Sequence, residues 1–413
     1  MADDKPEAEP VLLARLRAHF AADPSKLPVV EQAFAAYERA NLHLALQALL
    51  AEQDRAEDPV GVLALEYRSP GLARLARARS AADYDEGPVE YADAPLPGGR
   101  NLSCIKSALC LAANAAGPLA VLVTESERSY SPNPIIEVMA PAREEAERFL
   151  RELALRTRQG RAFKGHVLSL ETDCYRQLSV KFHALPNVTR ESLILPEALL
   201  QRIERHTLSF TRHAERLRAA GRHLKRGILL HGPPGTGKTL TAMYLASQMP
   251  GRTVMIMTGN GMGSVETACA LARALAPATL ILEDVDLVGT ERSHQTVGAN
   301  AILFELLNEM DGLGEDADIL FVLTTNRPEE LEPALAARPG RIDQAIEVPP
   351  PDAECRRRMI DLYGKGLRLE VGDWPRLIAR TEGASGAFLR ELLRKAAVFA
   401  AEESEGELAV RDA

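Results

Sequence analysis

The sequence is poor in aromatic residues, and this scarcity argues against one class of partner. Aromatic side chains make up 5% of the 413 residues, and there is a single tryptophan. Single-stranded nucleic acids are held by aromatic stacking beside basic grooves, so the few aromatics and the net charge of -9 disfavour a nucleic-acid partner. Arginine-rich stretches at 74–79 and 212–226 leave a local basic groove open, although such runs are usually solvated helix faces.

Cysteine and long apolar runs are also scarce. The five cysteines are odd in number and widely spaced, which indicates neither a disulfide framework nor a Cys-x-x-Cys metal site. We interpret them as buried thiols in a reducing compartment: Cys104, Cys110, Cys174, Cys269 and Cys355. Residues 1–10 are acidic and polar, unlike a secretory signal. The longest apolar stretch, 108–123, is interrupted by Asn114, Gly117 and Pro118 and falls short of the roughly 18 residues of a membrane span. We expect a cytoplasmic protein without a membrane anchor.

The first half of the sequence predicts helices followed by a mixed region. Residues 11–57 carry apolar positions at helical spacing and predict a helical hairpin, whereas 69–100 are rich in Pro, Gly, Asp and Ala and predict mainly loop. The following runs predict strands at 119–124, 135–139, 166–171 and 178–183 and a helix at 142–158. Together these runs predict a small α+β domain that ends near Pro196 and contains no catalytic constellation.

A glycine-rich loop stands between a predicted strand and a predicted helix. The apolar run 227–230 precedes the loop, and a helical pattern at 240–248 follows it. Backbone N–H groups of such a loop turn toward a phosphate, while Lys238 can reach the β and γ oxygens and Thr239 can meet Mg²⁺. No Asn-Lys-x-Asp guanine signature is present, which favours ATP over GTP. The predicted site for ATP and Mg²⁺ consists of Gly232, Pro233, Pro234, Gly235, Thr236, Gly237, Lys238, Thr239 and Leu240.

Polar residues follow two further apolar runs. The run 279–282 ends in Glu283 and Asp284; we expect Glu283 to support Mg²⁺ and Asp284 to orient and deprotonate the attacking water. The run 319–323 is followed by Asn326, a candidate sensor of the γ-phosphate. By its spacing alone, an Asn after a strand is more often a turn residue.

Beyond these motifs, residues 197–400 resemble the AAA family of ATPases. The resemblance is carried by Leu-Leu-Asn-Glu-Met-Asp-Gly-Leu at 306–313, Thr-Asn-Arg-Pro at 325–328, Arg-Pro-Gly-Arg-Ile-Asp at 338–343 and Gly-Ala-Ser-Gly-Ala at 383–387. It implies an α/β fold, a P-loop NTPase parallel sheet with a C-terminal helical lid, and a homo-oligomeric, hexameric ring. It also implies that Arg338 and Arg341 are arginine fingers acting on a neighbour's γ-phosphate; alone, two arginines around Pro-Gly would indicate a surface turn.

With the resemblance, the expected organisation has four parts. These are a helical N-terminal segment (1–60), an α+β client or adaptor domain of no recognised family (61–196), a large nucleotide-binding subdomain (197–350) and a helical lid (351–413).

Three departures from the family pattern qualify the resemblance. The acidic pair reads Glu-Asp where most members have Asp-Glu, as in the subgroup around the mitochondrial inner-membrane translocase. One additional residue precedes Arg338, which makes Arg341 the stronger finger candidate. The expected pore loop, 259–264, has no aromatic residue; Met262 could serve as an apolar paddle, or the loop could grip nothing. The sequence also lacks a His-Glu-x-x-His motif and a C-terminal aromatic tail, so any protease would be a separate chain.

Three functions remain open from the sequence. The leading expectation is a chaperone-like ring ATPase that remodels or disassembles a protein client recruited by the N-terminal region. A nucleotide-gated assembly or signalling module that threads nothing is the alternative. A nucleic-acid remodeller is weaker, because the charge and the lack of a stacking surface disfavour it. The Ala- and Arg-rich composition resembles that of bacteria with GC-rich genomes.

Overall fold

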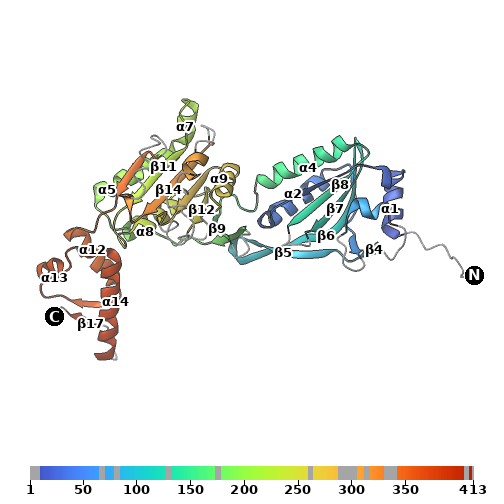
Figure 1. The fold of residues 1–413 in the computed structure, drawn as a ribbon. Helices are drawn as coiled ribbons and strands as arrows, with labels where there is room; N and C mark the ends of the chain where they lie inside the picture. Colours follow the sequence, from blue (N-terminus) through green and yellow to red (C-terminus); the bar gives the residue numbers. More distant parts are fainter. Residues whose placement is uncertain are drawn as a thin grey trace, which may run out of the picture. The chain divides into compact units, whose positions relative to one another are not determined.

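The structure is a computed structural model, and it contains two compact units. It describes residues 10–64, 70–78, 84–126, 133–172, 178–258, 264–286, 305–310, 317–329, 342–403 and 409–411. The first unit comprises Met1–Lys164 and Thr172–Phe182, and the second comprises Gly165–Glu171 and His183–Ala413 (Figure 1). Among the described residues, no helix has the length and apolar character needed to cross a bilayer.

The first unit alternates short helices with the strands of an antiparallel sheet. Its elements are α1 (Val11–Phe20), η1 (Pro24–Lys26), β1 (Val29–Ala33), η2 (Ala36–Glu38), α2 (Arg39–Ala51), β2 (Arg55–Ala56), β3 (Gly61–Ala64), α3 (Leu72–Leu75), β4 (Tyr84–Gly87), β5 (Glu90–Leu96), η3 (Pro97–Gly99), β6 (Arg100–Asn114), β7 (Gly117–Glu125), β8 (Pro134–Met139) and α4 (Arg143–Arg158). β10 (Leu178–His183) follows at the boundary between the units.

The sheet of the first unit is buried on both faces. Its strand order is β1-β8-β7-β6-β2, and β5 pairs with β6. One face packs on α2 and α4 through a core that includes Val121 and Ile136. In Figure 1, α4 lies along the strands of this sheet. The other face packs on α1, α3 and the β3–β4 pair through Leu109 and Leu122. Because neighbouring side chains point to opposite faces, burial of both faces requires a nearly continuous apolar run.

The double burial explains one sequence feature, and the elements of the first unit contradict two predictions. The apolar run at 108–123 is the β6–β7 hairpin, whose turn lies between Asn114 and Gly117. The predicted helical hairpin at 11–57 is wrong, because β1 lies between its two helices and pairs with β8. The predicted loop at 69–100 is also wrong, since its described residues include α3, β4 and β5. The expected strands at 119–124 and 135–139 and the helix at 142–158 are confirmed as β7, β8 and α4.

The second unit is an α/β domain with a helical C-terminal part. Its elements are β9 (Val167–Thr172), η4 (Arg190–Ser192), α5 (Glu197–Glu204), the π-helical η5 (Arg205–Ser209), α6 (Phe210–Arg212), α7 (Ala214–Ala219), β11 (Arg226–His231), α8 (Lys238–Ser247), β12 (Thr253–Met257), α9 (Val265–Ala274), β13 (Ala278–Leu282), β14 (Ile319–Thr325), β15 (Gln344–Glu347), α12 (Ala353–Tyr363), β16 (Arg368–Glu370), α13 (Trp374–Arg380), α14 (Gly386–Glu403) and β17 (Ala409–Arg411).

The sheet of the second unit places several strand ends at one edge. The strands run β9-β12-β13-β14-β11-β15 and pair in parallel. α5 and α8 pack on it through Leu200 and Leu245, in a core shared with Ile228 and Val322. In open parallel sheets, ligands bind outside the carboxyl ends of the strands. The carboxyl ends of β11, β13 and β14 therefore locate the candidate site.

The expected boundary between the domains at 196 is wrong. β9, predicted to belong to the N-terminal domain, pairs in parallel with β12 and so extends the sheet of the second unit. A period-2 pattern predicts a strand but does not say which sheet the strand joins. The predicted 1–60 segment is likewise part of the first unit rather than a module of its own.

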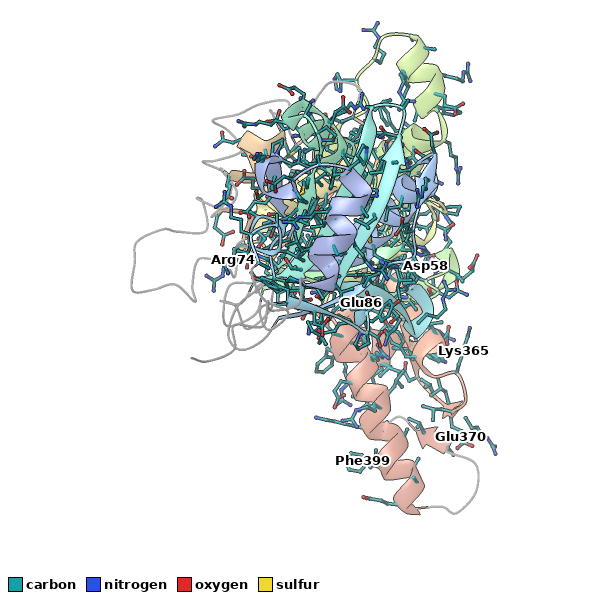
Figure 2. The ribbon with its side chains drawn as sticks, turned by 90° about the vertical axis from the view of Figure 1, so that its right-hand side faces the viewer. Asp58, Arg74, Glu86, Lys365, Glu370 and Phe399 are labelled. Atoms are coloured by element: carbon teal, nitrogen blue, oxygen red, sulfur yellow. The ribbon has the colours of Figure 1, made fainter. Side chains whose placement is uncertain are left out.

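The C-terminal helices have a small core of their own. Cys355, Met359 and Leu389 form its centre together with Ile194 from the segment before α5. α14 leaves large apolar side chains in solvent: Phe388 is 56% exposed and Phe399 is 62% exposed. Figure 2 labels Phe399 on this helix.

Candidate nucleotide-binding site

The glycine loop connects β11 to α8 in a conformation that requires glycine. Gly232 has φ +140, and a Cβ there would lie 2.4 Å from the carbonyl oxygen of Val348. At Gly235, with φ +76, a Cβ would lie 2.8 Å from the Ser385 hydroxyl. α8 then begins at Lys238 with no side chain capping its first turn. Its first N–H groups and the positive end of the helix dipole are consequently directed at the loop, as in anion-binding helix N-termini.

Lys238 is buried among neutral acceptors. It is 5% exposed, and its Nζ donates to the carbonyl oxygens of Gly232 and Pro233, both at 2.8 Å, and to Oδ1 of Asn326 at 2.7 Å. Burial lowers the pKa of the Lys238 ammonium, and the charges of Asp284 and Asp286 partly offset that effect. A cation buried without a carboxylate in direct contact is costly, and an anionic ligand would relieve that cost.

Asn326 joins Lys238 to Asp284. Its Oδ1 accepts from Lys238, and its Nδ2 donates to Oδ1 of Asp284 at 3.2 Å. The backbone of Asp284 has φ +49, an uncommon conformation for a non-glycine residue, and its N–H donates to Oγ1 of Thr324 at 3.0 Å. The predicted water-activating acid and the predicted sensor therefore lie in direct contact at the ends of neighbouring strands.

Asp286 is a site residue that the sequence analysis missed. It is 2% exposed, and its Oδ1 accepts from Oγ1 of Thr325 at 2.8 Å and from the backbone N–H of Asn326 at 3.2 Å. It thereby fixes the backbone that carries Asn326. A third acid two residues after Asp284 was visible in the sequence, but only the pairing of β13 with β14 brings it to Asn326.

The carboxylate of Glu283 is not fully satisfied by hydrogen bonds. Its Oε1 is buried and has no hydrogen-bond partner. Burial raises the pKa of its carboxyl group, and the neighbouring charge of Asp284 adds to the rise. The described residues contain no group of three or more His, Cys, Asp or Glu side chains that could cage a metal. Mg²⁺ usually binds through one or two protein ligands, substrate phosphates and water. The hydroxyl of Thr239, which lines the nucleotide cavity, and the unpartnered carboxylate oxygen of Glu283, which does not line it, are both oxygen ligands of the kind that Mg²⁺ takes.

A cavity of about 960 Å³ extends from the glycine loop to the C-terminal helices. The predicted residues on its wall are Pro234, Gly235, Thr236, Gly237, Lys238, Thr239, Leu240, Asp284 and Asn326. The wall also includes residues without an expected role, among them Ser192, Leu193 and Ile194 before α5, Met243 on α8, and Tyr363 and Arg390 from the C-terminal helices. No local motif marks these residues, because they come from segments far apart in the sequence.

Several predicted functional residues lie outside the described residues. They include the candidate arginine fingers Arg338 and Arg341 and residues 259–263 of the expected pore loop, with Met262. Their proposed roles remain predictions.

The ATPase family associated with various cellular activities (AAA) matches residues 228–350. The chain contains an AAA ATPase domain. This match spans the glycine loop, the acids after β13 and Asn326, and with the parallel sheet it confirms the predicted α/β P-loop NTPase fold class.

Curated relatives of the AAA domain include proteins of protein degradation. The chain is 34% identical over 230 residues to the proteasome-activating nucleotidase of Pyrococcus horikoshii, which covers 53% of this chain and 57% of the relative. It is 37% identical over 207 residues to the ATP-dependent zinc metalloprotease FtsH 2 of Symbiobacterium thermophilum, covering 47% of this chain and 35% of the relative. It is 34% identical over 206 residues to a 26S proteasome regulatory subunit 8 homolog of Schizosaccharomyces pombe, covering 46% and 51%. The chain therefore spans about half the length of these relatives or less.

Proposed function

We propose that the protein is an ATP-hydrolysing AAA ring ATPase that remodels or disassembles a protein client recruited by its N-terminal unit. The observation that carries the ATPase part is the contact chain from Lys238 through Asn326 to Asp284. In this chain a buried cation contacts a neutral amide, and the amide contacts a carboxylate, all at the carboxyl edge of the sheet. Phosphoryl transfer needs such a set, because its catalysis consists mainly of positioning and charge stabilisation.

The loop and Lys238 would bind the phosphates of ATP. The first N–H groups of α8 and the glycine-loop amides donate to the phosphate oxygens, and Lys238 exchanges its carbonyl partners for the β and γ oxygens. Thr239 and Glu283 would hold Mg²⁺, which neutralises charge on these oxygens when it is bound with the nucleotide. The apolar part of the cavity, between α8 and the C-terminal helices, is left for the base and the ribose.

Asp284 would activate the attacking water. Hydrolysis forms a bond from the water oxygen to the γ-phosphorus and breaks the bond from that phosphorus to the bridging oxygen, while the water proton passes to Asp284. Asn326 donates to Asp284 and accepts from Lys238, so a change at the γ-phosphate would alter both contacts together. That arrangement supports a role for Asn326 as the γ-phosphate sensor.

Two observations support a ring that acts on proteins. The names of the relatives describe a nucleotidase that activates the proteasome and an ATP-dependent protease. The exposed side chains of Phe388 and Phe399 on α14 form the kind of apolar surface that a neighbouring subunit would cover. In such a ring, Arg341, and with it Arg338, would act on the γ-phosphate bound by the next subunit.

The decisive experiment measures the ATPase rate against protein concentration, with mass photometry on the same samples. The variants are Asp284→Asn and Arg341→Ala, and Asp361→Asn on the surface of α12 is the matched control. We expect the wild-type specific rate to rise as oligomers form, both site variants to bind ATP without hydrolysing it, and the control to behave like the wild type. A rate independent of concentration together with an active Arg341→Ala would rule out the shared site and favour a nucleotide-gated binding module.

A further inference from the structure

The segment that precedes α5 forms one wall of the nucleotide cavity and touches two cores. Leu193 and Leu195 are buried in the core under the large sheet, together with Leu200 and Ile203. Ile194, between them, is buried in the core of the C-terminal helices. Ser192, Leu193 and Ile194 all line the cavity. We call residues 188–195 the connector; its position determines where this wall of the cavity lies.

Two carboxylates of α5 hold the connector through Arg190. Its Nε donates to Oε1 of Glu204 at 3.0 Å, and its Nη2 donates to Oε1 of Glu197 at 2.7 Å. Gln201 donates to the same oxygen of Glu197 at 2.7 Å. Arg190 thus spans α5 from its first residue to its last. An arginine held by two carboxylates has less freedom than a single exposed ion pair would leave it.

Glu204 also contacts α8, the helix that follows the phosphate loop. The hydroxyl of Tyr244, on α8, donates to Oε1 of Glu204 at 2.5 Å, and the Tyr244 side chain is 2% exposed. Burial and the contact with Glu204 raise the pKa of Tyr244 to about 12, so the hydroxyl remains a donor at neutral pH. A second contact joins α8 directly to the connector, because Oγ of Ser247 donates to the carbonyl oxygen of Val188 at 3.1 Å.

We propose that Arg190, Glu204 and Tyr244 are positioning residues that hold the connector against α8 and thereby set the affinity for the nucleoside part of the nucleotide. The proposal rests on the proposed function, since it assumes that the cavity binds ATP. The phosphate loop is built from residues 232–239 and does not use this network. Loss of the network should therefore weaken recognition of the base and ribose while phosphate binding persists.

Calorimetry with two ligands tests this division. MgATP occupies the whole cavity, whereas inorganic tripolyphosphate with Mg²⁺ reaches the phosphate loop alone. For Tyr244→Phe and for Arg190→Ala we expect the Kd of MgATP to rise about tenfold, the loss that one hydrogen bond to a charged group can produce. The Kd of tripolyphosphate should stay within about twofold, the KM for ATP should rise with the Kd, and kcat should stay near the wild-type value.

Further variants separate positioning from stability. Arg190→Lys can keep one of the two carboxylate contacts and should restore part of the affinity. The double variant should lose less than the sum of the single losses, because both residues act through Glu204. Asp318→Asn is the matched control: it breaks an ion pair with Arg252 outside the cavity, and it should lower the melting temperature without changing either Kd.

The possible results distinguish the two proposals. A wild-type protein that binds neither ligand would overturn the proposed function and this inference together. Wild-type binding of MgATP with unchanged Kd in Tyr244→Phe and Arg190→Ala would overturn the inference alone. So would an equal loss of affinity for both ligands, because the network would then act on the phosphate loop or on overall folding.

Discussion

Two cations of the second unit are equally buried and yet differently paired. Lys238 and Arg252 are each 5% exposed, and they lie at opposite edges of the same sheet. Arg252 precedes β12 at the amino edge, where its Nη1 donates to Oδ1 of Asp318 at 2.7 Å and its Nη2 donates to the carbonyl oxygen of Ala278 at 2.6 Å. Lys238 follows β11 at the carboxyl edge and contacts two carbonyls and an amide.

The difference lies in the charge of the partners. A buried cation is tolerated when a carboxylate neutralises it, and Arg252 meets that condition within the protein. Lys238 has only neutral partners in direct contact, so part of its charge remains available to a phosphate. We infer that the paired cation stabilises the fold, whereas the cation with neutral partners serves the ligand.

The largest effect is expected at Lys238. Lys238→Met removes the charge that meets the phosphates, so the affinity for MgATP should fall by a factor on the order of 10³. Stability should change little or rise, because the variant replaces a buried cation with an apolar side chain. Calorimetry and thermal unfolding check both parts. Lys225→Met is the matched control, since Lys225 donates to the carbonyl oxygen of Met310 and does not line the cavity.

The opposite pattern is expected at Arg252. Arg252→Met leaves the carboxylate of Asp318 without its cation, and breaking a buried pair in this way costs about 3–5 kcal/mol. Chemical denaturation should show that loss, while the Kd of MgATP for the folded protein should stay close to the wild-type value. Adding Asp318→Asn to this variant should recover part of the stability. If Arg252→Met weakened MgATP binding as much as Lys238→Met, the contrast between the two edges would be wrong.

A smaller effect is expected at Asp286, which holds the backbone of Asn326. Asp286→Asn keeps the shape but weakens the hydrogen bonds from Thr325 and Asn326, so kcat should fall about tenfold to a hundredfold through misplacement of Asn326. The Kd of MgATP should change much less. Steady-state kinetics and calorimetry test this separation. Asp343→Asn is the control, because Asp343 accepts from the backbone N–H of Gly227 at the other end of β11.

The smallest effect concerns the stability cost of Glu283. Its pKa is raised in the folded protein, so the folded state binds a proton at a higher pH than the unfolded chain does. Stability therefore falls as the pH rises through the interval between the unfolded and the folded pKa. Glu283→Gln should raise the melting temperature at pH 7, on the order of 2 °C, and hydrolysis should be lost. The difference from wild type should shrink as the pH falls toward the usual 4.5 of a Glu; a constant difference would contradict the assignment.

The strands that carry the candidate site were easier to predict from the sequence than the elements of the first unit. The glycine loop, Glu283, Asp284 and Asn326 follow β11, β13 and β14, whose apolar runs are continuous because these strands are buried on both faces. In the first unit, β1 lies within residues 11–57, whose apolar spacing predicted helices alone. β5 lies in a stretch whose composition indicates loop. Propensity does not identify such strands, since their stability comes from pairing with partners far along the chain.

By itself, the sequence located the candidate phosphate site: a loop that requires glycine, a lysine after it, and acids at a strand end. Spacing along the chain is enough there, because strand, loop and helix are consecutive. Only the tertiary structure decided that β9 joins the nucleotide sheet, that Asp286 holds Asn326, and that Arg190 reaches Tyr244 through Glu204. These contacts join residues from separate elements, and such proximity arises from strand pairing and helix packing rather than from any local pattern.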